Sequence, residues 1–195
     1  MGYNSLKYNS TGSNNTSSGS FSLITNTTGS DNTANGYASL NSNTTGYSNA
    51  ANGAYSLVYN TTGFYNAAHG NNSLLNNTTG NSNTAIGVTS EITNTIGSQN
   101  TLIGYAADVS SNNLSNAMAI GYNAKVASNN TIVLGNTSVS KIGGQVGWTS
   151  ASDVRIKKNI RDTQYGLATV MQLRPVEYTL ISNELKQVGF IAQEV

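Results

Sequence analysis

A serine lies five residues before a lysine near the C-terminal end of the chain, in the segment Ser152-Asp-Val-Arg-Ile-Lys157. A serine hydroxyl becomes a nucleophile when a base accepts its proton, and a partly desolvated lysine can act as that base. We therefore interpret Ser152 as a candidate nucleophile and Lys157 as its candidate base. Serine and lysine are common residues, so this spacing alone is a weak signal and is more typical of two ordinary structural side chains.

A seventeen-residue unit precedes this segment and repeats from the N-terminus past the midpoint of the chain, with the pattern A-x-G-x-x-S-L-x-x-N-T-T-G-x-x-N-x. One glycine in each unit keeps a constant spacing: Gly2, Gly19, Gly36, Gly53, Gly70, Gly87, Gly104 and Gly121. A second glycine series, two asparagine series and a leucine series have the same period. Repetition this strict is typical of a stacked architecture in which each repeat contacts only its neighbours.

Each unit predicts one coil of a parallel β-solenoid. Two glycines and a run of Asn and Thr in every unit disfavour a helix, and no apolar stripe has a helical period. We expect two short strands per unit, as in 83–87 and 37–40, separated by a turn at N-T-T-G where the glycine takes a positive φ. Stacking places like residues above one another, so the asparagines should form ladders and the leucines a continuous apolar seam. One leucine per unit is a modest core, so we also expect several chains to associate.

The composition excludes several functional classes. Only 9% of the residues are charged and the net charge is +1, which leaves no basic surface for nucleic acid. No apolar run approaches the roughly 18 residues of a membrane span, and no targeting signal is visible at the N-terminus. Cysteine is absent and His69 is the sole histidine, so we expect neither a metal site nor a cofactor.

The distribution of charge predicts a domain boundary close to residue 150. Residues 1–151 contain six of the Asp, Glu, Lys and Arg side chains, whereas residues 152–195 contain the other eleven. We expect a repeat β-roll over residues 1–136, with 17-residue units to about residue 115 and a 14-residue form over 116–136. A connector should follow over 137–151.

Residues 152–195 predict a small α+β segment. Apolar side chains at i, i+3 and i+4 in Tyr165–Leu173 predict a short amphipathic helix, which ends before Pro175. Alternating apolar residues predict strands over 176–181 and 187–195.

The 14-residue form carries a first resemblance to known proteins. The segment Asn116-Ala-Met-Ala-Ile-Gly-Tyr122 is echoed fourteen residues later by Asn130-Thr-Ile-Val-Leu-Gly-Asn136. This form resembles the head repeat of trimeric autotransporter adhesins, and the 17-residue units look like the related, longer repeats of fibre-like surface proteins. The resemblance covers about 130 residues. It implies a mainly β fold, a left-handed parallel β-roll in which three identical chains pack around one axis.

A second resemblance covers the C-terminal 50 residues or so. The blocks G-W-T-S-A-S-D-V-R-I-K-K-N-I, L-R-P-V-E-Y and G-F-I-A-Q-E-V occur in this order, and together they resemble the start of the C-terminal intramolecular chaperone and autoprotease of endosialidases and phage tail fibres. In that family the domain drives trimerisation of the fibre and then releases itself by cutting the chain beside the serine. Because family members continue beyond A-Q-E-V, we expect the N-terminal part of the domain only, in a truncated form.

Carried over to this chain, the resemblance implies that Ser152 is the nucleophile of a serine autoprotease and Lys157 its base. Asp153 and Arg155 match the motif as well, and we assign them a structural role. Attack on the preceding carbonyl, at Ala151, is the simplest geometry for a serine that acts on its own backbone, so the expected cleavage site comprises Ala151, Ser152 and Asp153. No feature points to an external substrate.

Together these observations predict a homotrimeric fibre segment of a phage tail fibre, tailspike or similar contractile appendage, outside the cell and on the virion tail. Its partners would be two copies of the same chain and a receptor on the host surface, for which a glycan is one candidate. Aromatic residues in variable repeat positions could form a strip for glycan stacking or could be contacts between chains: Tyr37, Tyr47, Tyr55, Phe64 and Tyr65. The alternative function is an ice-binding or other adhesive β-solenoid that uses its paired threonines and does not process itself.

Overall fold

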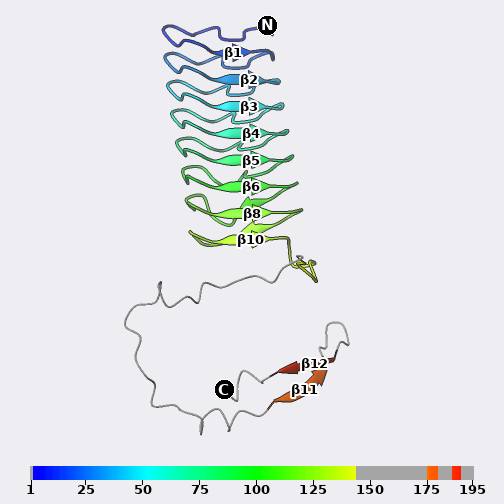
Figure 1. Ribbon diagram of the computed structural model, residues 1–195. Helices are drawn as coiled ribbons and strands as arrows, with labels where there is room; N and C mark the ends of the chain where they lie inside the picture. Colours follow the sequence, from blue (N-terminus) through cyan, green and yellow to red (C-terminus); the bar gives the residue numbers. More distant parts are fainter. Residues whose placement is uncertain (1, 144–174, 180–185, 190–195) are drawn as a thin grey trace, which may run out of the picture. The chain divides into compact units, whose positions relative to one another are not determined.

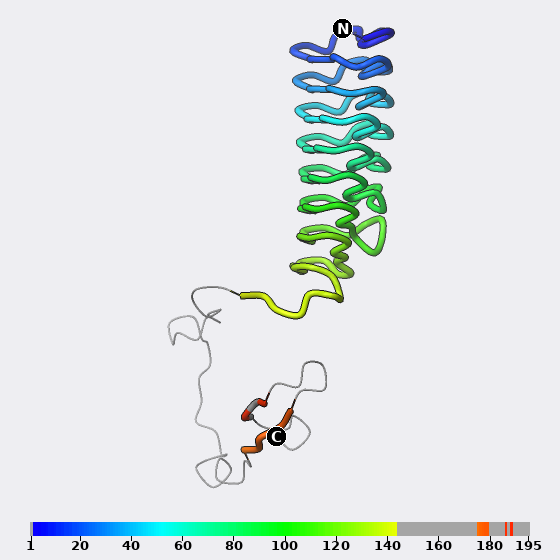
Figure 2. The backbone as a smooth tube through the Cα atoms, turned by 90° about the vertical axis from the view of Figure 1, so that its right-hand side faces the viewer, coloured from blue at the N-terminus to red at the C-terminus, as the bar shows by residue number. Residues whose placement is uncertain are grey.

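The computed structural model describes residues 2–143, 175–179 and 186–189. The chain divides into two compact units, Met1–Ile142 and Gly143–Val195. The first unit is a parallel β-solenoid whose coils stack one above the other along its whole length (Figure 1, Figure 2). The predicted fold class, mainly β with a parallel solenoid of short repeats, is confirmed. The described residues contain no helix, and hence none that could span a membrane.

One short strand from each coil joins a single eight-stranded parallel sheet, which runs down one side of the stack (Figure 1). Its strands, in order, are β1 (Thr16–Ser17), β2 (Thr33–Asn35), β3 (Ala50–Asn52), β4 (Ala67–His69), β5 (Thr84–Ile86), β6 (Thr101–Ile103), β8 (Met118–Ile120) and β10 (Ile132–Leu134). Neighbouring strands pair one full unit apart, for example Ala51 with Ala68. The middle residue of β2 to β5 and of β8 is a fully buried alanine that points into the narrow interior of the coil, and in β6 this residue is Leu102.

The expected second strand of each unit is absent from the coils before residue 104. At residues 37–40, Ala38 and Leu40 have φ values of 54° and 49°, and the same left-handed pair recurs in the other coils, so the chain forms consecutive turns there. Left-handed conformations at residues with a side chain are strained. The stack compensates with hydrogen bonds between coils, such as that from the Leu40 N–H to the Ser56 carbonyl at 3.0 Å. These turns point each leucine into the coil. A strand of the same length would also point it inward, so the leucine position alone does not distinguish a turn from a strand.

A second strand does form in the two coils closest to the C-terminal end of the solenoid. There β7 (Asp108–Val109) pairs in parallel with β9 (Lys125–Val126). Val109 and Val126 are fully buried and replace the leucine seam as the apolar filling on this side. The two-strand expectation is thus right for these coils and wrong for those before them.

The two glycine series serve different purposes, and the expectation of a positive φ at N-T-T-G is wrong. The positive φ values belong to the other series, as at Gly70, with φ of 137°. The N-T-T-G glycines are required instead by close packing. A Cβ on Gly46 would lie 2.5 Å from the carbonyl oxygen of Gly63 in the next coil.

The predicted asparagine ladders are confirmed, and they satisfy the polar groups inside the coils. In the first asparagine ladder (Asn9, Asn26, Asn43, Asn60, Asn77 and Asn94), the Nδ2 of Asn43 donates to the Oδ1 of Asn26 at 2.7 Å. In the second asparagine ladder (Asn15, Asn32, Asn49, Asn66, Asn83 and Asn100), the backbone N–H of Asn49 donates to the Oδ1 of Asn32 at 3.0 Å. Buried amides are stable only when they are hydrogen-bonded, so each coil depends on its neighbour in register.

The apolar core has two sections. The upper section is the predicted leucine seam with the inward alanines: Leu23, Leu40, Leu57, Leu74, Ala34, Ala51, Ala68 and Ala85. The lower section is more varied and includes β-branched residues: Leu102, Ala107, Val109, Leu114, Ala117, Ala119, Ala124 and Val126. The change between them coincides with the end of both asparagine ladders.

In the second unit, the structure describes an antiparallel pair of strands, β11 (Val176–Thr179) and β12 (Lys186–Gly189). β11 lies within the strand expected over 176–181, and β12 begins one residue before the strand expected over 187–195. The helix expected over 165–173 lies outside the described residues.

Candidate functional surfaces

The candidate catalytic residues of the sequence lie outside the part of the chain that the structure describes. Ser152 and Lys157 belong to this group, as do the cleavage-site neighbours Ala151 and Asp153. Their geometry is therefore untested, and their roles stay predictions.

An aromatic strip runs along one edge of the first four coils. Its rings come alternately from two neighbouring positions after the glycine, so that they interleave: Tyr3, Phe21, Tyr37 and Tyr55. Successive centroids lie 5.6, 5.7 and 5.3 Å apart in edge-to-face geometry, which is a favourable arrangement for aromatic pairs. Much of each tyrosine ring stays exposed.

A groove beside this aromatic strip has a volume of about 600 Å³. Its walls combine aromatic, aliphatic and amide side chains: Phe21, Tyr37, Tyr55, Tyr59, Val58, Leu75, Ala38, Asn41 and Asn72. No carboxylate or amine lines it, so its chemistry is that of stacking faces with a few neutral hydrogen-bonding groups. A second aromatic group, Tyr47, Phe64 and Tyr65, occupies another corner of the coils, where Tyr47 and Phe64 stack at 4.8 Å.

The outward face of the eight-stranded sheet changes character along its length. In the upper coils the last strand position carries a hydrogen-bonded polar row, in which Asn35 donates to Asn52 at 2.8 Å and Asn52 lies 3.2 Å from the His69 ring. This places His69 in a polar row, and the described residues hold no cluster of three potential metal ligands. From β5 onward the last strand position is apolar, and from β8 onward the first strand position is apolar as well. We call these apolar side chains the lower sheet face: Ile86, Ile103, Met118, Ile120, Ile132 and Leu134.

The side chains of the lower sheet face are only partly covered. Ile86 is 42% exposed and Ile132 is 66% exposed. A continuous apolar row on a stack this regular is typical of a contact surface. The sequence analysis missed it, although the signal was visible as the change from asparagine to isoleucine at one repeat position.

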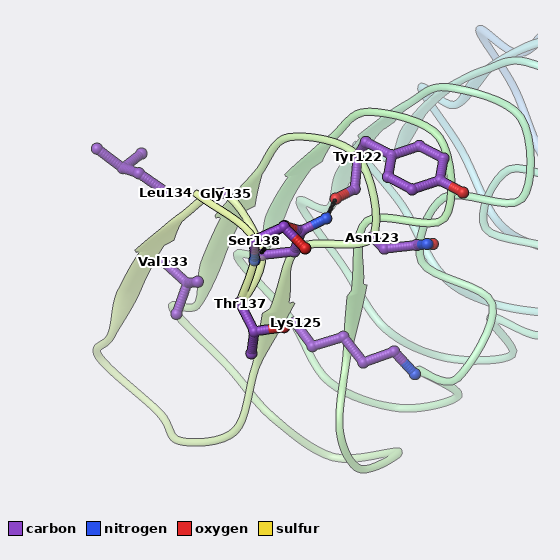
Figure 3. A pocket seen from close by; sticks show the side chains of 9 residues that line it. Tyr122, Asn123, Lys125, Val133, Leu134, Gly135, Thr137 and Ser138 are labelled. Atoms are coloured by element: carbon purple, nitrogen blue, oxygen red, sulfur yellow. Dashed lines mark hydrogen bonds between the residues drawn. The ribbon is translucent and has the colours of Figure 1, made fainter. Parts of the chain in front are cut away.

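A hollow of about 640 Å³ lies at the lower end of the solenoid, between the last two coils and the chain that leaves them (Figure 3). Tyr122, Asn123 and Lys125 line it from one coil, and Val133 and the segment 134–138 line it from the next. The Nδ2 of Asn136 donates to the Tyr122 carbonyl at 2.9 Å and fastens the exit of the chain to the coil above.

Comparison with known proteins gives a family match for the C-terminal segment. Residues 152–195 match the model of a family described as the chaperone of endosialidase. This segment begins at Ser152 and includes Lys157, β11 and β12. No curated protein and no solved structure matches the chain.

Proposed function

We propose that the chain is a segment of a homotrimeric fibre, in which the β-solenoid forms the shaft or head and residues 152–195 form part of the chaperone that brings three chains together. The observation that carries this proposal is the order of the two parts: a regular solenoid followed at once by a segment that matches the chaperone of endosialidase family. Such a fibre acts outside the cell, on a virion tail or a comparable contractile appendage, and its solenoid coils are akin to adhesin head repeats.

The lower sheet face supports the trimer. It belongs to the coils closest in sequence to the chaperone segment, and its isoleucines recur at one position of successive strands. Burial of an exposed isoleucine side chain stabilises a contact by roughly 1.5 to 3 kcal/mol. Three chains that each contribute this row to a common axis would bury many such side chains.

The double variant Ile103→Asn with Ile120→Asn should weaken or abolish the trimer, because it removes apolar contact from every chain. Each coil should still form, since Asn35 and Asn52 occupy the same position in the upper coils. Light scattering of the full-length protein gives the mass, and thermal melting gives the dissociation temperature.

The matched control for this experiment is Ile96→Thr, which removes an exposed isoleucine from a different face and restores the usual residue of the repeat. The control should stay trimeric. A monomeric wild-type protein would contradict the trimer itself, whereas an unchanged double variant would contradict only the assignment of the lower sheet face.

Receptor binding is the second part of the proposed function. The groove beside the aromatic strip favours a neutral glycan, because sugar rings stack on exposed tyrosine faces and the amides of Asn41 and Asn72 can form hydrogen bonds with hydroxyls.

The ice-binding alternative has less support. The first threonine of each pair already donates to the neighbouring coil, as Thr44 does to the Thr61 carbonyl at 3.0 Å, so a flat array of free hydroxyl pairs does not form.

Self-cleavage beside Ser152 is the third part. In the intact gene product, Ser152→Ala should abolish cleavage completely and leave trimer formation unchanged, since the hydroxyl is needed for the attack and not for assembly. Intact-mass spectrometry reads out the cleavage, and Ser150→Ala is the matched control that removes a nearby hydroxyl. Cutting of the Ser152→Ala protein at the same bond would refute the assignment.

A further inference from the structure

A carboxylic acid occupies the leucine seam at the point where the solenoid changes its core. The residues at this register are fully buried leucines from Leu23 to Leu74, and the next is Glu91, which is also fully buried. One unit further on stands Asp108, which is nearly buried. Neither side chain belongs to the proposed trimer contact, the receptor groove or the cleavage segment.

Glu91 interrupts the first asparagine ladder. In the regular coils the Nδ2 of each asparagine donates to the Oδ1 of the one before it, as Asn77 does to Asn60 at 2.8 Å. Asn94 should donate to Asn77 in the same way, yet its Nδ2 donates to the Oε1 of Glu91 at 2.9 Å. The ladder bond between Asn94 and Asn77 is therefore missing.

Two buried acceptors are left without a donor at this place. They are the Oδ1 of Asn77 and the Oε2 of Glu91, and they are the buried side-chain oxygens that lack a hydrogen-bond partner among the described residues. An unsatisfied buried acceptor is costly, and a buried carboxylate without a cation is more so. A hydrogen atom shared between the two oxygens would remove both costs, and only the carboxyl group can acquire one.

We propose that Glu91 is a proton-binding site of the folded solenoid: the carboxyl group is neutral, and its Oε2–H donates to the Oδ1 of Asn77 and replaces the missing ladder bond. The proton comes from solvent and no other bond changes. In this form Oε1 still accepts from Asn94, so both oxygens of Glu91 and the Oδ1 of Asn77 are satisfied.

The surroundings of Glu91 favour the neutral form. Burial raises the pKa of Glu91 to about 8, and the negative charge of Asp108 in the next coil adds to this, while the amides of Asn94 and Asn100 act in the opposite direction. Asp108 is itself engaged by Thr93, whose hydroxyl donates to it at 2.6 Å. It therefore offers no donor to Glu91.

The bound proton makes the solenoid sensitive to pH. The pKa of Glu91 is 4.5 in an ordinary setting and about 8 in the folded chain, so between these values the folded state keeps a proton that the unfolded state releases. The contribution to stability is fully present below about pH 4.5 and is lost as pH rises towards about 8. Over this window the unfolding equilibrium constant should rise by up to about tenfold per pH unit.

The variant Glu91→Gln tests the proposal, because a glutamine amide cannot ionise and can donate to Asn77 while it accepts from Asn94. Urea denaturation of the full chain at one protein concentration, between about pH 5 and about pH 8, should show a steep loss of stability for the wild type that Glu91→Gln lacks. Asp31→Asn is the matched control, since it removes an exposed carboxylate from the same solenoid and should keep the wild-type slope.

Infrared spectroscopy of the full-length protein with ¹³C-labelled glutamate carboxyl groups gives a second readout that does not depend on unfolding. At neutral pH the wild type should show the carbonyl band of a protonated acid, and Glu91→Gln should lack it. Wild-type and Glu91→Gln curves with the same pH slope, or a wild-type spectrum with carboxylate bands only, would overturn the proposal.

Discussion

Replacement of Asn49 by alanine should destabilise the solenoid by roughly 3 to 5 kcal/mol per chain. The side chain of Asn49 accepts from the backbone N–H of Asn66 at 3.0 Å and donates to the Gly63 carbonyl at 2.8 Å. Alanine cannot replace either bond, so the N–H of Asn66 stays buried without an acceptor, next to a small cavity. Chemical denaturation followed by circular dichroism measures the loss.

Asn71→Ala is the matched control for this prediction. Asn71 is also an asparagine of the solenoid, two coils after the coil of Asn49, but its side chain is exposed. Its removal should change the unfolding free energy by less than about 0.5 kcal/mol. Equal effects of the two substitutions would show that the asparagine ladders add nothing to the stability of the stack.

Gly70→Ala should destabilise the solenoid about as much as Asn49→Ala does, but through backbone strain and a steric clash. The backbone of Gly70 has a φ of 137°, and an added Cβ would lie 2.6 Å from the carbonyl carbon of Gly87 in the next coil. Strain of the backbone and separation of the two coils together should cost roughly 2 to 6 kcal/mol. Thermal melting should show a clear drop in the transition temperature.

The control is Gly143→Ala, since a Cβ at Gly143 meets no atom within 4 Å and should leave the transition unchanged. A Gly70→Ala protein that melts with the wild type would mean that neighbouring coils are more loosely packed than the structure shows.

Much of the solenoid could be predicted from the sequence because its main constraint is periodic. The spacing of Asn32, Asn49 and Asn66 forces like side chains into columns, and a buried column of amides must find its hydrogen-bond partners within the stack. The leucine seam follows from the same argument. These features depend on the repeat length alone, which the sequence states directly.

The local backbone could not be predicted in the same way. Both glycine series are equally regular, so the period does not show that Gly70 needs a positive φ while Gly46 needs space for a neighbouring carbonyl. The inward direction of Leu40 is likewise compatible with a strand or with a left-handed turn. The choice depends on hydrogen bonds between coils, which become visible only in three dimensions.

The candidate sites also differ in how much of each could be predicted from the sequence. The roles of Ser152 and Lys157 rest on sequence likeness, and the family match at residues 152–195 supports the chaperone assignment without testing their chemistry. Glu91, in contrast, could have been singled out from the sequence, because it lies seventeen residues after Leu74 and seventeen before Asp108. Its consequence needed the structure, since only the coordinates show which acceptors lose their donor.

Because each strand pairs with the strand one whole unit away, the length of the solenoid can change in whole units. An interior coil such as that of β3 meets an almost identical coil on either side, so duplication or deletion of one whole unit would create no new kind of junction. Each such event would change the length by about 4.8 Å. The length of such a solenoid can therefore vary by duplication or loss of one repeat within the gene, while its two end coils stay unchanged.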